Sequence, residues 1–132
     1  MNKEVFSSYY FLVEVDGLQS SRFFECDGIE METEVIEVEE GASIRKFPGK
    51  TKIKNIVLRK GISKDNELFH WYQSFLKGTF EKKTISVILM DFAHREVQRY
   101  DFLKAFSCRW KGPRLDVQDN SFATEMIEIA FG

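Results

Sequence analysis

Residues 47–78 read FPGKTKIKNIVLRKGISKDNELFHWYQSFLKG, a pattern that predicts a tight turn, a strand and a helix in that order. Pro48-Gly49 is typical of a turn, because proline presets its own φ and glycine accepts positive φ without a Cβ clash. Apolar and polar side chains alternate over residues 52–60, as they do in a strand, and Gly61 ends that alternation. We therefore expect one strand immediately before the helix.

The segment between Asp65 and Lys77 is predicted to be an amphipathic helix, and the pattern predicts no second one. Ser63 or Asp65 can cap its N-terminus, and Lys77 with Gly78 can close its C-terminus. Its apolar side chains fall in one arc about 160° wide. They are Leu68, Phe69, Tyr72, Leu76 and, expected in the core, Trp71 and Phe75. Since no other helix is predicted to receive this arc, we expect it to lie on a sheet.

Strand-like patterns recur along the rest of the chain, at residues 6–15, 22–27, 31–40, 84–91, 97–106 and 122–131. With residues 52–60, they predict about seven strands and one helix. Short turns between consecutive strands favour antiparallel pairing. The predicted fold class is therefore mainly β (α+β): an antiparallel β-barrel or sandwich with one flanking helix. A length of 132 residues predicts a single domain over residues 1–132.

The composition argues against several classes of protein. The chain is 43% apolar and 30% charged with a net charge of −2, so it lacks the basic excess of a nucleic-acid-binding protein. We expect neither a signal peptide in the first residues nor a transmembrane helix, because no apolar run is long enough. Without secretion, Cys26 and Cys108 are expected to be reduced thiols.

A reversal of charge marks residues 30–50. Residues 30–40 hold six glutamates among Val and Ile, and residues 41–50 form a predicted loop with Arg45, Lys46 and Lys50. No Asp-x-Asp-x-Asp-Gly pattern or histidine accompanies the carboxylates, so we expect no metal site there. Opposite charges on neighbouring segments can serve association between copies of the chain or pairing within one hairpin.

No set of residues predicts catalysis or cofactor binding. His70 lies on the polar face of the predicted helix, and His94 lies in a predicted turn beside Asp91. A dyad of Asp91 and His94 with Ser107 or Cys108 is conceivable, but the spacing fixes no geometry. The glycines are scattered, and no phosphate-binding loop is present in the sequence. From the residues alone, the expectation is a β-rich module without a visible active site.

An ordered series of short motifs extends over roughly residues 11–130. Its centre is Pro-Gly followed by the sequence Asn–aliphatic–Leu–Arg–Lys–Gly at residues 55–61. The motif residues are Gly28, Gly41, Pro48, Gly49, Asn55, Leu58, Arg59, Gly61, Trp71, Trp110, Pro113 and Glu125. This series resembles the tail tube proteins of contractile phages and phage-derived contractile injection systems. Two positions depart from the family pattern: Tyr100 stands where Trp is common, and Ser107 where Pro is common.

The resemblance implies a compact barrel or sandwich similar to the tube protein of type VI secretion. It further implies hexameric rings that stack into a hollow tube, with a contractile sheath and a baseplate as partners and DNA or effectors as cargo. Assembly would take place in the bacterial cytoplasm, without a cofactor, an enzymatic activity or membrane insertion of the subunit. We expect the contact between subunits or rings to include Glu37, Glu39, Glu40, Arg45, Lys46, Phe47 and Lys50.

Three other functions remain open at this point. The chain could be a tube initiator of the same family that lies next to the baseplate. It could also be a small-ligand carrier, which predicts a monomer with an apolar internal cavity. A small enzyme would need a cleft with titratable groups whose pKa values are perturbed.

Overall fold

The structure, a computed structural model, describes residues 8–16, 23–78, 82–119 and 122–132. In these residues it has eight strands and one helix, one strand more than the sequence predicts. The elements are β1 (Tyr10–Val15), β2 (Phe23–Asp27), β3 (Met31–Glu40), β4 (Ser43–Ile53), β5 (Ile56–Gly61), α1 (Glu67–Leu76), β6 (Lys83–Met90), β7 (Glu96–Lys111) and β8 (Thr124–Ala130). Residues 6–7 and Arg22 of the predicted strands lie outside the described residues.

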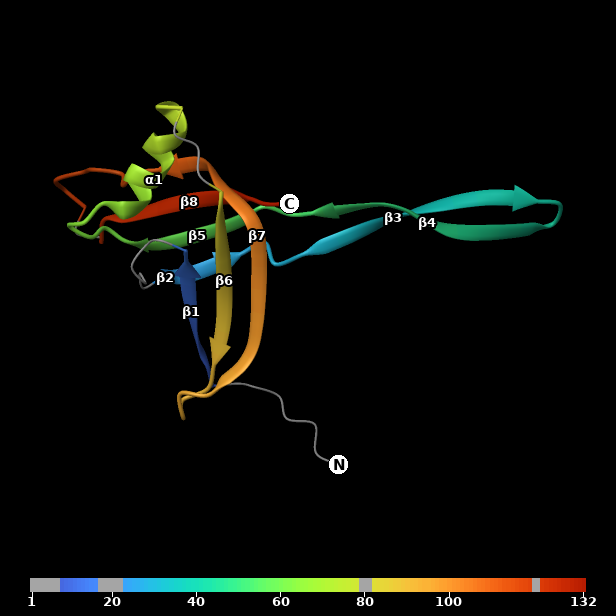
Figure 1. Cartoon of the computed structure of the whole chain (residues 1–132), viewed down its shortest axis with the longest axis horizontal. Coiled ribbons are helices and arrows are strands. Elements are labelled where there is room, and N and C mark those ends of the chain that lie inside the picture. The colour runs from blue at the N-terminus through green and yellow to red at the C-terminus, as the bar shows by residue number, and fades with distance from the viewer. Residues whose placement is uncertain (1–7, 17–22, 79–81, 120–121) are drawn as a thin grey trace.

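Six strands form one antiparallel sheet in the order β1-β6-β7-β8-β5-β2. The 16-residue strand β7 joins its two halves: β7 pairs with β6 up to Ala105 and with β8 from Phe106 onward. Figure 1 shows β7 bending, so that β1 and β6 run across the direction of β2, β5 and β8. The bent sheet folds onto itself, which confirms the predicted antiparallel β fold.

The core lies between the two halves of the bent sheet. Both halves contribute fully buried side chains, such as Ile85 from β6 and Ile127 from β8. The helix adds Leu68 and Trp71 to this core, as its apolar arc predicts. Phe75 was expected there but is 46% exposed. Figure 1 shows the reason, since the C-terminal end of α1 rises away from the strands.

The ends of α1 differ in how far they follow the predicted caps. The helix begins after Asn66, whose side chain makes no capping hydrogen bond. The predicted cap Asp65 still receives a hydrogen bond at its Oδ1 from the Glu67 backbone N–H, at 3.3 Å. At the other end, Lys77 and Gly78 donate backbone hydrogen bonds to the carbonyls of Gln73 and Phe75, so they close the helix as predicted.

Three predictions around residues 41–60 are wrong. Pro48-Gly49 is no turn and residues 41–50 are no loop, because Ser43–Ile53 is the strand β4, which pairs with β3. The predicted strand at residues 52–60 is broken between Ile53 and Ile56. A β-bulge explains why Pro48 and Gly49 are tolerated: between Thr33 and Val35 one residue of β3 faces two of β4, where a missing donor or side chain costs little.

We call the β3–β4 hairpin, residues 31–53, the arm. Figure 1 shows it extending away from the body formed by the other elements. Every residue of the arm strands except Gly49 is exposed, and β3 has no extensive contact with any described element other than β4. The chain reverses within the arm between Glu40 and Ser43, where Gly41 has a φ of 61°.

Candidate assembly surface

The arm carries all seven residues that the sequence predicts at a subunit contact. Glu37, Glu39 and Glu40 lie on β3, and Arg45, Lys46, Phe47 and Lys50 lie on β4. The structure brings two opposite charges together on each side of the hairpin. Arg45 Nη1 lies 3.3 Å from Glu40 Oε2, and Lys46 Nζ lies 3.8 Å from Glu37 Oε1.

These ion pairs show that the reversal of charge serves pairing within one hairpin. All four side chains are more than half exposed, so each pair is worth only ~0.2–1 kcal/mol. Lys46 lies directly opposite Glu37, and Arg45 reaches Glu40 diagonally, so both pairs still favour this register over a shifted one. Arg45 also lies over the ring of Phe47, 5.6 Å from its centroid.

Sequence reasoning missed the apolar side chains of the arm as candidate contact residues. Those with exposed side chains are Met31, Val35, Ile36, Val38, Ile44, Phe47 and Ile53, and only Phe47 was predicted. Met31 is 74% exposed and Ile44 60% exposed. The signal is present as β-branched residues alternating with charges, but a predicted loop over residues 41–50 gives the strand at residues 31–40 no second strand with which to share two faces.

The apolar side chains occupy both faces of the arm. Opposed residues of two antiparallel strands share a face, and successive residues alternate between faces. The first face comprises Glu32, Glu34, Ile36, Val38 and Glu40 of β3 with Ser43, Arg45, Phe47 and Lys52 of β4, and the second face comprises Met31, Thr33, Val35, Glu37 and Glu39 of β3 with Ile44, Lys46, Pro48, Thr51 and Ile53 of β4. Each face therefore holds one ion pair and at least three apolar side chains.

A groove of about 580 Å³ lies where the arm leaves the body. Its apolar lining comes from Met31 and Ile53 on the second face of the arm and from the body residues Ile29, Tyr100, Phe102 and Phe131. Glu30, Arg99 and Asp101 add charges to this lining. The second face of the arm is thus continuous with an apolar hollow of the body.

Glu125, one of the motif residues, lies in a buried network inside the body. Its Oε1 is 3.6 Å from Lys60 Nζ, and its Oε2 accepts a hydrogen bond of 3.0 Å from Trp110 Nε1. Lys60 donates a further 2.7 Å bond to Ser63 Oγ, which donates to Asp65 just before α1. These hydrogen bonds lower the pKa of Asp65, with the Ser63 hydroxyl contributing most. The network fixes the start of the helix on the sheet.

Asn55 and Arg59 are held by carboxylates on neighbouring strands. Asn55 Nδ2 donates a 2.9 Å hydrogen bond to Glu128 Oε2, and Arg59 forms an ion pair with Glu25. Gly28 is needed where the chain passes β5, because a Cβ there would lie 2.1 Å from the Asn55 carbonyl oxygen. The other motif residues are structural as well: Leu58 and Trp71 are buried, Gly61 ends β5, and Pro113 follows β7.

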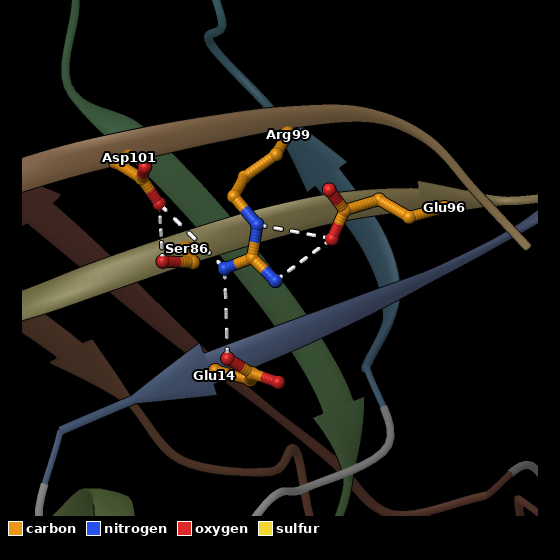
Figure 2. A network of polar contacts seen from close by, with 5 residues as sticks. All are labelled: Glu14, Ser86, Glu96, Arg99 and Asp101. Atoms are coloured by element: carbon orange, nitrogen blue, oxygen red, sulfur yellow. Dashed lines mark hydrogen bonds and ion pairs between the residues drawn. The ribbon is translucent and has the colours of Figure 1, made fainter.

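Figure 2 shows a charged network on the outer face of the sheet, which sequence reasoning did not find. Arg99 of β7 lies 2.8 Å from Glu96, 3.8 Å from Asp101 and 3.8 Å from Glu14 of β1. Asp101 also accepts a 2.5 Å hydrogen bond from Ser86 of β6. The hydrogen bond to Glu96 and the nearby carboxylates raise the pKa of Arg99. No local signal relates residues 14, 86 and 99, because only strand pairing brings them together.

The conceivable dyad of Asp91 and His94 does not form. His94 Nδ1 shares a 2.8 Å hydrogen bond with the hydroxyl of Tyr10, while Asp91 binds Arg95 and two backbone N–H groups. Ser107 is buried in β7, and Cys108 lies against Glu128. In the described part of the chain, no three His, Cys, Asp or Glu side chains are grouped so that they could hold a metal.

Both cysteines are free thiols with raised pKa values. Burial and the nearby Asp27 raise the pKa of Cys26 to about 11. Burial and the Glu128 carboxylate raise the pKa of Cys108. Both groups are therefore protonated near neutral pH, which makes them weak nucleophiles.

Residues 7–132 match the family model of the T4-like virus tail tube protein gp19. The chain belongs to this tail tube family. The resemblance inferred from the motif residues is thereby confirmed. In this tail tube protein Gly41 lies in the turn of the arm, Pro48 and Gly49 lie at its β-bulge, and the other motif residues lie in the body. In contrast to the body, the arm exposes nearly all of its side chains to solvent.

Solved structures of injection systems contain similar chains. A chain in the extended-state PVC sheath-tube complex of an extracellular contractile injection system is 29% identical, with a TM-score of 0.83, over 92% of this chain and 83% of that one. A chain in the PVC sheath/tube terminator structure is 28% identical, with a TM-score of 0.88, over 98% of this chain and 94% of that one. No curated protein sequence matches significantly.

The fold is also similar to that of Hcp1 from Flavobacterium johnsoniae. The identity is 17% and the TM-score 0.59, over 92% of this chain and 89% of that one. The two chains therefore share a β-rich fold at low sequence identity. Within the described residues, no helix is both long and apolar enough to cross a membrane.

Proposed function

We propose that this chain is a subunit of the inner tube of a contractile injection system or phage tail, where it forms hexameric rings that stack around a lumen. The observation that carries this proposal is the arm, a hairpin with apolar side chains exposed along its length. An isolated two-stranded hairpin is only marginally stable in water. An arm of this kind gains its stability when other subunits cover it.

Two contacts are needed to build a tube from one kind of subunit. A head-to-tail contact that closes on itself makes the ring, and a second contact that never closes makes the stack. The ends of the sheet order, β1 and β2, each have one edge without a paired strand in the described structure. Strands of adjacent copies can pair at such edges, which converts an aggregation hazard into an assembly contact.

The proposed contact includes Glu37, Glu39, Glu40, Arg45, Lys46, Phe47 and Lys50 of the arm. Because two of the acidic residues already pair with Arg45 and Lys46, the charges set register and orientation more than affinity. Most of the binding free energy comes from the apolar side chains, at roughly 25 cal/mol per Å² of buried apolar surface.

The proposal extends to the partners of the tube. A contractile sheath would surround it and a baseplate would hold its first ring, in keeping with the sheath-tube complex that contains a similar chain. DNA or effector proteins would travel through the lumen, and the particle would assemble in the bacterial cytoplasm. In this reading the subunit has no enzymatic activity and needs no cofactor.

Electron microscopy of the purified chain tests the proposed function. After concentration, negatively stained samples should show six-fold rings, and stacks of rings mark a main tube subunit. Single rings that never stack would favour a subunit from one end of the tube. A chain that stays monomeric at high concentration, both alone and with its baseplate, would overturn the proposal.

A further inference from the structure

We propose that the body carries a binding site for a single phosphate dianion, either free or as the terminal monoester of a larger molecule. The site lies on the face of β5, β8 and the end of β7 that is turned away from the core. Three cations from different segments line one pocket there: Arg59 of β5, Lys111 of β7 and Arg114 of the chain that follows β7. The proposal does not depend on tube assembly, because the site belongs to one subunit.

Strand pairing places two of these cations on either side of Met126. Arg59 on β5 and Lys111 on β7 both lie directly opposite Met126 on β8. Directly opposed residues share a face of the sheet, and neighbouring strands are ~4.8 Å apart. The backbones of Arg59 and Lys111 are therefore roughly 10 Å apart, a separation that two long side chains can bridge through one small ligand.

Met126 forms the floor of the pocket between these two cations. It is 5% exposed, although it does not belong to the core cluster of the body. Its neighbours across both strands are Arg59 and Lys111, whose aliphatic stems can cover apolar surface while their charged ends stay in water. Stems packed in this way lose less freedom when a ligand binds.

The third cation is brought to the pocket by the turn after β7. A Cβ on Gly112 would lie 2.8 Å from the Trp110 ring, so a larger residue there would displace the ring. Pro113 then restricts the backbone, because its own ring fixes φ. Gly112 and Arg114 both line the pocket, so this turn places a guanidinium in the same pocket as Lys111.

Two of the three cations have no counter-charge within the subunit. Arg59 forms an ion pair with Glu25, so its charge is balanced. Lys111 and Arg114 pair with no carboxylate in the ranges of the chain that the structure describes. Like charges that share a pocket repel each other, and a bound anion removes this repulsion.

The acidic residue that lines the pocket does not balance these charges. Glu125 Oε1 lies 3.6 Å from Lys60 Nζ, and its Oε2 accepts a hydrogen bond from Trp110 Nε1. Its carboxylate is thus compensated inside the body. With three cations at the pocket and one of them balanced by Glu25, two positive charges remain.

The other half of the sheet shows how the chain balances an arginine on its surface. Arg99 is surrounded there by Glu14, Glu96 and Asp101, as Figure 2 shows. One cation meets three carboxylates in that network, whereas two cations at the pocket meet none within the described residues. The anion that belongs at the pocket therefore comes from outside the subunit.

The size and charge of the pocket favour a phosphate dianion. Its volume is about 150 Å³, room for roughly five water molecules at ~30 Å³ each, so it holds one compact oxyanion but no base or sugar. A phosphate monoester has a charge of about −1.5 to −2 near neutral pH, which matches two unbalanced cations. A carboxylate would balance only one of them. Guanidinium groups bind phosphate oxygens in pairs, and the Thr124 hydroxyl at the pocket adds a donor.

Equilibrium dialysis of radiolabelled inorganic phosphate against the full chain tests the proposal. In about 0.1 M salt, where the Debye length is ~10 Å, the unmodified chain should bind one phosphate per subunit with saturation. Arg114→Gln removes one of the two unbalanced charges and should weaken binding roughly tenfold or more. Binding that does not saturate, or that is unchanged in this variant, overturns the proposal.

Arg109→Gln is the matched control. Arg109 is exposed and lies two residues before Lys111 on β7, but it does not line the pocket. Its substitution should weaken phosphate binding by at most about threefold, because the charge is screened at this salt concentration. Phosphate should raise the melting temperature of the unmodified chain and of Arg109→Gln, but not that of Arg114→Gln. Equal loss of binding in both variants would indicate diffuse surface charge and overturn the proposal.

Two oligonucleotides distinguish a terminal monoester from the free ion. A short single strand with a 5′-phosphate and the same strand without it are each used to displace the radiolabelled phosphate. Displacement by the phosphorylated strand alone, at lower concentration than inorganic phosphate requires, identifies a terminal monoester as the ligand. Displacement by inorganic phosphate alone identifies the free dianion. Equal displacement by both strands would mean that the backbone binds without a dianion, which contradicts the proposal.

Discussion

At the scale of single residues, Glu125 shows how the body accommodates a charge in its core. The Glu125 and Lys60 side chains are 1% and 4% exposed, and Trp110 and Ser63 provide the remaining hydrogen bonds. Desolvation of two charges offsets much of their attraction, so such a pair contributes little net stability. The pair affects the free energy of unfolding mainly when one partner is removed and the other charge is left buried alone.

Lys60→Met and Glu125→Gln are expected to destabilise the body by ~3–5 kcal/mol each, because each leaves a buried charge without its partner. The double variant is expected to recover much of this loss. Urea unfolding of the four proteins gives the coupling energy. If the two single effects simply add, the residues do not act as a pair.

A second residue-scale prediction concerns Gly28. Its φ is 100°, and an added Cβ would lie 2.1 Å from the Asn55 carbonyl oxygen, so Gly28→Ala should cost at least ~1–3 kcal/mol. Gly61→Ala is the matched control, because a Cβ there meets no atom within 4 Å and φ is not in the left-handed region. The two variants should differ clearly in denaturant midpoint. Equal midpoints would mean that the Gly28 bend relaxes freely.

At the scale of elements, α1 and the approximate positions of the body strands could be predicted from the sequence, whereas the arm could not. The predicted strand at residues 97–106 is too short, because β7 continues to Lys111. The helix repeats its apolar residues at helical spacing, and β6 is apolar on both faces as an interior strand should be. In the arm, Pro48-Gly49 has the composition of a turn but lies opposite Val35 in a bulge. The turn preference of Pro48-Gly49 is outweighed by the pairing of β4 with β3, which cannot be recognised from the local sequence.

The same limit applies to the assembly surface. The charges of Glu37, Arg45 and Lys46 could be found because they are close in sequence. The grouping of apolar side chains on the two faces of the arm could not be found in the same way, because it arises only when β3 and β4 pair in their actual register. The groove at the root of the arm joins Met31 to Phe131, which are distant in sequence.

Reversing the charge of the arm tests its role as an element. In the double variant Arg45→Glu/Lys46→Glu, like charges would face Glu40 and Glu37, so the arm register and the yield of rings or tubes should fall. The body should keep its stability to within about 0.5 kcal/mol, because the substitutions are exposed. Lys64→Glu, at an exposed position off the arm, is the control. Rings and stacks in normal amounts would exclude Arg45 and Lys46 from the contact.

At the scale of the whole molecule, the body and the arm are separable. The core residues come from β1, β2, β5, β6, β7, β8 and α1, and none comes from β3 or β4. The two ends of the arm meet at its root, where Lys54 N–H donates a 3.1 Å hydrogen bond to the Glu30 carbonyl. The arm can therefore be removed without opening the core.

A chain in which residues 31–53 are replaced by Asn-Gly, a common two-residue hairpin turn, should fold as a stable monomer. Its near-UV circular dichroism and cooperative unfolding should resemble those of the full chain, while electron microscopy should show no rings or tubes. Tubes formed without the arm would contradict its role in assembly. Loss of cooperative unfolding would mean that the body depends on the arm.

The shared strand β7 has a mechanical consequence. Since its first part belongs to one half of the sheet and its second part to the other, a push on either half travels to the opposite half along covalent bonds. The two halves cannot slide past each other unless this strand bends further or its ladders rupture. A subunit built in this way is stiff under compression, which suits a column that is driven forward by its end.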